Sequence, residues 1–114
     1  MTHRDPKLCA EYSGAGLCEL CGRCVPTQCA HVASRGTGQL DIAENLVALC
    51  VYCHSWQHTE AGQAALVEHV SRKSRMTVDA WWQLIYDLRR EPKAVLSRAE
   101  MRALVELLKK EPKE

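Results

Sequence analysis

Two pairs of cysteines, each with two residues between them, place the strongest constraint on how this chain of 114 residues can fold. The pairs are Cys18 with Cys21 and Cys50 with Cys53. At this spacing one turn of backbone can direct both sulfurs to one ion, and four thiolates form a closed tetrahedral zinc site. Residues 22–49 separate the pairs, more than a simple zinc ribbon has, so this insert should form a structure of its own.

Three observations favour a metal over disulfides for these thiols. The first ten residues hold Arg4, Asp5 and Lys7 and no apolar stretch, so we see no secretion signal and expect a cytoplasmic protein. No apolar run approaches the roughly 18–20 residues that span a bilayer. Disulfides do not persist in a reducing compartment, and the cysteine count of seven is odd.

A second register of cysteine ligands is open at the level of the sequence. Cys21 and Cys24 also form a pair with two residues between them. We favour Cys18 with Cys21 because Gly22 then follows the second thiolate and relieves the turn around the ion. Buried free thiols are the alternative, and they are the default for the remaining three cysteines, Cys9, Cys24 and Cys29.

The composition suggests why a bound metal would help this chain to fold. There is no Phe, and three Trp and three Tyr are the only aromatic residues, a thin supply of large core side chains for a small fold. Apolar residues make up 46% and charged residues 25%, which is typical of a globular domain and excludes a collagen, a coiled-coil rod or a wholly disordered chain. The net charge of +1 predicts weak long-range attraction to nucleic acid, so any such contact must use local patches.

The pattern predicts a small α+β fold in one compact domain, with a metal-held part at 1–60 and a helical extension at 61–114 packed on it. Thr77 is a good N-cap, and Ser97 with Glu100 forms a capping box. The expected elements are an extended segment at 28–34, a turn at 35–38, a buried strand at 46–49, and helices at 51–60, 63–72, from Thr77 to about 90, and after Ser97.

Histidines near the second cysteine pair suggest a further ion. His54 and His58 are four residues apart, so on a helix they share one face and can meet one cation. His31 lies in the expected extended segment, and Asn45 precedes the expected strand. Each has an ordinary alternative, because a lone histidine is more often a hydrogen-bonded polar side chain than a ligand, and an asparagine can simply serve a turn.

The order of these residues resembles the HNH endonuclease superfamily, the ββα-metal nucleases, and in particular the phage and prophage branch that carries paired cysteines. The resemblance covers about residues 18–58. The matching features are Cys18 and Cys21, then Ala30-His31-Val32, then Gly36 and Gly38, then Asn45 to His54 with Cys50 and Cys53, and last His58.

The resemblance implies a ββα-metal motif held by a structural Zn²⁺ on Cys18, Cys21, Cys50 and Cys53, and hydrolysis of DNA phosphodiester bonds. In the implied roles, His31 is the general base, and Asn45 ties the hairpin together and helps to orient that base. His54 and His58 are implied as ligands of one catalytic divalent cation, which could be Mg²⁺, Mn²⁺, Ni²⁺ or Zn²⁺. The implied partner is DNA rather than a membrane, with a homodimer or a phage or host DNA-processing protein as further possibilities.

One departure from the family pattern concerns the residue before the implied base. Many members have Asp or His there as a metal ligand, whereas this chain has Ala30. Asp41 is the nearest spare carboxylate, and His31 itself could serve as a ligand. The sequence therefore also allows a rival, a non-catalytic zinc module derived from an HNH nuclease that binds nucleic acid or protein. A thiol redox protein is a more distant rival, which the absence of a βαβ pattern disfavours.

Overall fold

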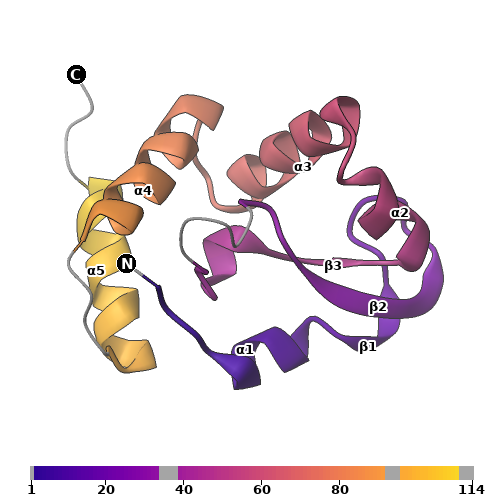
Figure 1. Cartoon of the computed structure of the whole chain (residues 1–114), viewed down its shortest axis with the longest axis horizontal. Helices are drawn as coiled ribbons and strands as arrows, with labels where there is room; N and C mark the ends of the chain where they lie inside the picture. Colours follow the sequence, from indigo (N-terminus) through magenta and orange to yellow (C-terminus); the bar gives the residue numbers. More distant parts are fainter. Residues whose placement is uncertain (1, 34–38, 92–95, 111–114) are drawn as a thin grey trace.

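The computed structural model describes residues 2–33, 39–91 and 96–110, so the predicted turn at 35–38 lies outside the described residues. Within them the chain has a small mixed α+β fold, with a three-stranded antiparallel sheet in the order β1-β2-β3 beside a group of helices (Figure 1). The elements are α1 (Pro6–Glu11), β1 (Gly14–Leu17), β2 (Cys24–His31), the 3-10 turn η2 (Ala43–Asn45), β3 (Leu46–Leu49), α2 (Val51–Trp56), α3 (Glu60–Lys73), α4 (Val78–Arg90) and α5 (Arg98–Lys110).

The long central strand β2 carries a different partner on each half. Its first half pairs with β1 in a register that places Leu17 opposite Cys24. Its second half pairs with β3, so that His31 lies opposite Leu46. The predicted strand at 46–49 is confirmed, and Figure 1 shows β3 running through the middle of the molecule. β3 lies at the edge of the sheet, and its apolar side chains join a core that also includes residues of the helices.

The chain turns directly from β3 into α2, which contacts both β2 and β3. The predicted helix at 51–60 is too long, because α2 ends at Trp56 and a new helix begins at Glu60. Thr59 caps the new helix, with its Oγ1 accepting the N–H of Gly62 at 3.0 Å. A Cβ atom at position 62 would run into the carbonyl oxygen of Trp56, so only glycine permits this close turn between α2 and α3.

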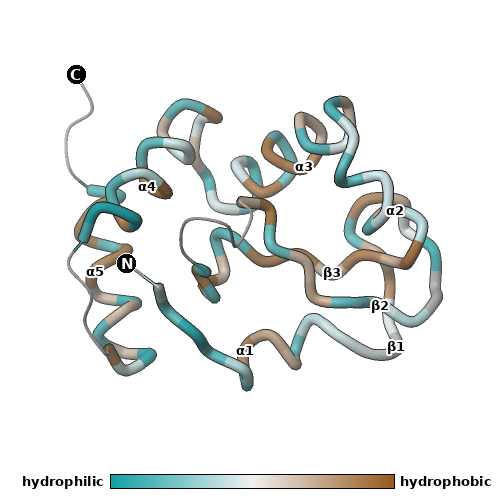
Figure 2. Tube along the Cα trace, viewed as in Figure 1, coloured by the Kyte–Doolittle hydropathy of each residue, from teal (hydrophilic) through white to brown (hydrophobic). Residues whose placement is uncertain are grey.

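A single set of buried apolar residues spans both the first 60 residues and the helices that follow. Val47 and Leu49 of β3 are fully buried against residues of α3, α4 and α5. Trp81 of α4 is also fully buried, and its Nε1 donates to the carbonyl oxygen of Glu44 at 2.7 Å. Apolar residues accordingly gather along β3 and on the inward sides of the helices (Figure 2). The predicted N-caps of α4 and α5 are confirmed by Thr77 and Ser97.

The first residues of the chain lie against the segment that leads into η2, a contact that the local sequence pattern does not predict. His3 forms a bridge with Leu40. Asp5 caps α1 by accepting the N–H of Leu8 at 3.1 Å, and its own N–H donates to Asp41 Oδ2 at 2.8 Å. These bonds place α1 beside the end of β2. Across the described ranges, the helices all fall short of the length and apolar character that crossing a bilayer requires.

Candidate metal centre and histidine cavity

Four cysteines from two distant segments come together at one end of the sheet. The Sγ atoms of Cys18, Cys21, Cys50 and Cys53 all lie within 4.8 Å of one another, and those of Cys21 and Cys50 are 3.7 Å apart. This cluster could hold a structural metal ion, as the spacing predicts. Cys29 is not part of the cluster, and the side chain of Cys24 lies outside what the structure describes.

The backbone around Cys18 is shaped to stabilise a thiolate. Gly22 adopts a left-handed conformation with φ of +74° and donates its N–H to the carbonyl oxygen of Cys18 at 2.9 Å, which closes the turn. Burial raises the pKa of the Cys18 thiol, but the backbone N–H groups of Cys21, Cys50 and Leu20 bring that pKa down to about 6. A pre-formed anion of this kind is what a metal ligand must supply.

A carboxylate anchors this cysteine turn to the rest of the fold. Glu19 Oε2 accepts the N–H of Ala48 in β3 at 2.7 Å, and the Glu19 N–H donates to the carbonyl oxygen of Ala48 at 2.9 Å. Its Oε1 accepts from His69 and from Lys73, both of α3 and both at 3.0 Å. The turn is therefore held by the sheet and by α3 even before any ion is considered.

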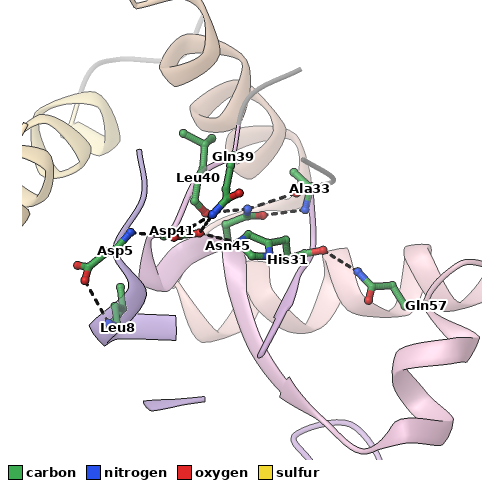
Figure 3. Close-up of polar contacts among 9 residues, drawn as sticks. All are labelled: Asp5, Leu8, His31, Ala33, Gln39, Leu40, Asp41, Asn45 and Gln57. Carbon is green, nitrogen blue, oxygen red and sulfur yellow. Dashed lines mark hydrogen bonds and ion pairs between the residues drawn. The ribbon is translucent and has the colours of Figure 1, made fainter. Parts of the chain in front are cut away.

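His31, the last residue of β2, forms a close pair with a buried carboxylate (Figure 3). Its Nε2 lies 2.6 Å from Oδ1 of Asp41, which is 2% exposed. Burial raises the pKa of Asp41, but the hydrogen bonds from His31, from the N–H of Asp5 and from Gln39 hold that pKa below its ordinary value. An ionised carboxylate only accepts hydrogen bonds, so Nε2 carries the proton of this bond, and the neutral form of the ring has its lone pair on Nδ1.

Asn45 joins the end of β2 to the start of β3. Its Oδ1 accepts the N–H of Ala33 at 2.7 Å, and its Nδ2 donates to the carbonyl oxygens of Ala33 and Leu40 at 3.3 and 3.0 Å (Figure 3). Its own carbonyl oxygen accepts the N–H of Val32 at 2.9 Å. The side chain is fully buried, so it satisfies backbone groups that would otherwise have no partner in the core.

His31, His54 and His58 line one cavity of about 640 Å³. The rings of His54 and His58 are roughly parallel, with centroids 6.3 Å apart. His54 Nδ1 is hydrogen-bonded at 2.5 Å to Oε1 of Gln28, an arrangement that fixes the orientation of the ring. His58 lies in the turn after α2, whereas His54 lies on α2, so the two do not share one helix face as predicted. Both nevertheless line the cavity.

The same cavity includes residues that sequence reasoning missed. Gln57 is only 7% exposed, and its Nε2 donates to the carbonyl oxygen of His31 at 2.6 Å. Its buried Oε1 has no hydrogen-bond partner among the described residues. Trp82 and Arg89 of α4 line the cavity as well, so the helical extension supplies part of its wall. Nothing in the spacing of these residues signals that they meet.

Ala30 occupies a different position from the one that the family pattern suggests. It is 1% exposed, belongs to the apolar core and lies opposite Val47 in the sheet. Successive residues of a strand face opposite sides, so Ala30 points away from the face that presents Cys29 and His31 to the cavity. The position before His31 is therefore a core position in this chain, and a ligand introduced there would not reach the cavity.

A second group of side chains that could hold a metal ion consists of Cys9 of α1 and the pair of His31 and Asp41. One ligand atom each from Cys9, His31 and Asp41 lies within 4.8 Å of the others. Burial, followed by the neighbouring Cys29 thiol and the charge on Asp41, raises the pKa of the Cys9 thiol to about 12. Cys9 is therefore a neutral thiol at physiological pH when no cation is present.

No family model, no curated protein and no solved structure matches this chain.

Proposed function

We propose that the chain is a metal-dependent endonuclease of the HNH type, in which β2, β3 and α2 form a ββα-metal motif. One observation carries the proposal. His31, His54 and His58 line a single cavity, and His31 is paired with a buried carboxylate, Asp41. The arrangement separates one histidine suited to proton transfer from two suited to binding a cation.

The donor set at the cavity fits a divalent cation. Two imidazoles suit Zn²⁺, Ni²⁺ or Mn²⁺, and water and substrate oxygens would complete the coordination, as they also would for Mg²⁺. His54 would act through Nε2, because Nδ1 is engaged by Gln28. When bound, the cation supplies positive charge for the scissile phosphate and the leaving oxygen.

His31 is the proposed general base. Its Nδ1 lone pair takes a proton from the attacking water, and an imidazole is suited to this at neutral pH. Asp41 then stabilises the resulting imidazolium through the bond at Nε2. Gln57 and Asn45 fix the backbone that follows this histidine, at the His31 carbonyl and at Val32 and Ala33.

DNA is the proposed substrate, and the cavity walls support a phosphate-bearing ligand. Arg89 places a guanidinium at the wall formed by α4, and guanidinium groups bind phosphate oxygens well. The unpartnered Oε1 of Gln57 offers a buried acceptor to a bound water or ligand donor. Zn²⁺ on Cys18, Cys21, Cys50 and Cys53 would fix the turn before β2 to the start of α2, and so hold the motif together.

Nicking of supercoiled plasmid tests the proposal. The protein is washed with a weak chelator, shown by elemental analysis to keep one zinc per chain, and then given Mn²⁺, Ni²⁺ or Mg²⁺ in separate titrations. We expect conversion to the open circle that depends on added metal. A folded, zinc-loaded protein that binds DNA but is inert with every metal would contradict the proposal and favour a non-catalytic DNA-binding module.

A further inference from the structure

Cys9 has no part in the proposed reaction, but it completes a three-residue cluster with His31 and Asp41. Its ligand atom lies within 4.8 Å of those of His31 and Asp41, and these three come from α1, the end of β2 and the segment before η2. The Cys29 thiol lies near Cys9 and is one of the causes that raise the pKa of the Cys9 thiol. Cys9 and Asp41 do not line the histidine cavity, so the cluster shares only His31 with the site of His54 and His58.

Asp41 helps to fix the position of Cys9, because it binds the residue that caps α1. Asp41 Oδ2 accepts the N–H of Asp5 at 2.8 Å, and Asp5 in turn caps α1. Arg98 of α5 donates to both carboxylate oxygens of Asp5, at 2.7 and 2.8 Å. The helix that bears Cys9 is therefore held at its start from two directions, and the cluster does not depend on a loosely placed chain end.

We propose that Cys9, His31 and Asp41 form a second zinc site, with Cys9 Sγ, His31 Nε2 and an Asp41 carboxylate oxygen as ligands. A thiolate, an imidazole and a carboxylate are the three ligand types that zinc uses in proteins. The ligand atoms are already gathered, and the change required is small. The Nε2 and Oδ1 atoms, now 2.6 Å apart around a proton, separate by roughly 0.7 Å to become tetrahedral ligands of the ion.

Binding of Zn²⁺ at this site releases one proton. A coordinated thiol loses its proton, so Cys9 releases one proton to solvent. His31 stays neutral and moves its proton from Nε2 to Nδ1, while Asp41 remains a carboxylate. The net reaction exchanges one Zn²⁺ for one proton.

Zinc in this site would switch off the proposed base, a consequence that rests on the proposed function. With Nε2 bound to the ion and Nδ1 protonated, His31 has no lone pair left to accept a proton from water. Zinc at the Cys9 site and cleavage are therefore mutually exclusive. Mn²⁺ or Mg²⁺ at His54 and His58 would support the reaction, because these ions bind a thiolate poorly.

The test counts zinc in the full chain by equilibrium dialysis against micromolar Zn²⁺. We expect wild type to hold one zinc per chain more than Cys9→Ala, whereas Lys7→Ala, an exposed change on the same helix, holds as much as wild type. Far-ultraviolet circular dichroism shows that each variant is folded. Equal zinc in folded wild type and Cys9→Ala overturns the proposal.

A second measurement separates this site from the proposed nuclease. In the Mn²⁺ nicking assay, added micromolar Zn²⁺ should inhibit wild type at least tenfold more strongly than Cys9→Ala. Equal inhibition of the two proteins would overturn the switch. The protein could also bind an extra zinc that depends on Cys9 and yet fail to nick DNA with every metal tested. That outcome would support the zinc site and contradict only the nuclease proposal.

Discussion

The Nε2 atom of His31, the last residue of β2, lies 2.6 Å from Oδ1 of Asp41, which comes 10 residues later in the chain. Asp41 is itself held by the N–H of Asp5 and by Gln39. A carboxylate fixed in this way selects one tautomer of the histidine and one orientation of its ring. The proton on Nε2 and the lone pair on Nδ1 are therefore properties of the folded protein rather than of the imidazole alone.

Asp41→Asn tests this pairing. Loss of a carboxylate behind a functional histidine typically costs about 10–100-fold, and we expect that loss in plasmid nicking. Long-range ¹H–¹⁵N NMR of wild type without added zinc should show the Nε2–H tautomer of His31, and Asp41→Asn should show a smaller share of it. A wild-type spectrum with the proton on Nδ1 at neutral pH would contradict the assignment.

Cys50→Ser should remove the metal and unfold the first half of the chain. Structural zinc supplies on the order of 10 kcal/mol of apparent folding free energy in small peptides, and Cys50 is one of the four clustered thiols. Elemental analysis and thermal unfolding measure the two effects. Cys29→Ser is the matched control, because Cys29 lies outside the four-cysteine cluster and its loss should leave that zinc in place. Wild type purified without zinc, yet fully folded, would contradict the account.

Ala30→Asp should destabilise the protein rather than tighten its catalytic ion. The new carboxylate would enter the core opposite Val47 without a partner, at a cost on the order of 3 kcal/mol. Ala30→Ser, similar in size and uncharged, should cost clearly less. Chemical denaturation gives both values, and a metal titration of nicking gives the affinity for the ion. Tighter metal binding by a stable Ala30→Asp would show that position 30 reaches the cavity.

Glu44 provides a prediction for the pH dependence of stability. It is 5% exposed and accepts hydrogen bonds from Arg102 and Lys109 of α5. Burial raises the pKa of Glu44, but Arg102 and then Lys109 hold that pKa below its ordinary value of 4.5. The stabilisation is therefore complete above about pH 4.5 and is lost as the pH falls through the lower pKa of the folded state.

Glu44→Gln should lower the free energy of unfolding by about 1–2 kcal/mol at pH 7, since Arg102 and Lys109 lose hydrogen bonds to a charged acceptor. The difference from wild type should shrink as the pH falls toward 3. Glu106→Gln removes the exposed partner of the same arginine and should cost less than about 0.5 kcal/mol. A deficit for Glu44→Gln that is constant from pH 7 to 3 would contradict the assigned ionisation.

Local sequence features, such as helix N-caps and short apolar runs, predicted much of this fold. The N-caps at Thr77 and Ser97 set the starts of α4 and α5, and the apolar run of β3 reads directly as a buried strand. The end of α2 was predicted at residue 60 rather than at Trp56, because the actual break depends on the close approach of Gly62 to the Trp56 carbonyl, a contact that helix periodicity does not contain.

The candidate site was predicted less completely, for a physical reason. The cysteine cluster follows from spacing, but Cys9 reaches His31 only because Asp5 donates to a carboxylate 36 residues away. Gln57 and Arg89 likewise meet at a cavity that exists only after α4 has packed. The core position of Ala30 follows from a simple rule, because neighbouring residues of a strand face opposite sides and His31 faces the cavity. That rule outweighs the family pattern at this position.

The central claim is that His31 moves a proton while His54 binds the ion, and one nicking assay tests it most directly. Wild type, His31→Ala, His54→Ala and the control His69→Ala, which loses only a bond to Glu19 outside the cavity, are titrated with Mn²⁺ on supercoiled plasmid. We predict that His31→Ala loses about 10²–10⁴-fold in rate with its metal midpoint unchanged, and that His69→Ala resembles wild type. His54→Ala should need far more Mn²⁺. Equal loss of metal affinity in His31→Ala and His54→Ala, or full activity in His31→Ala, would contradict the account.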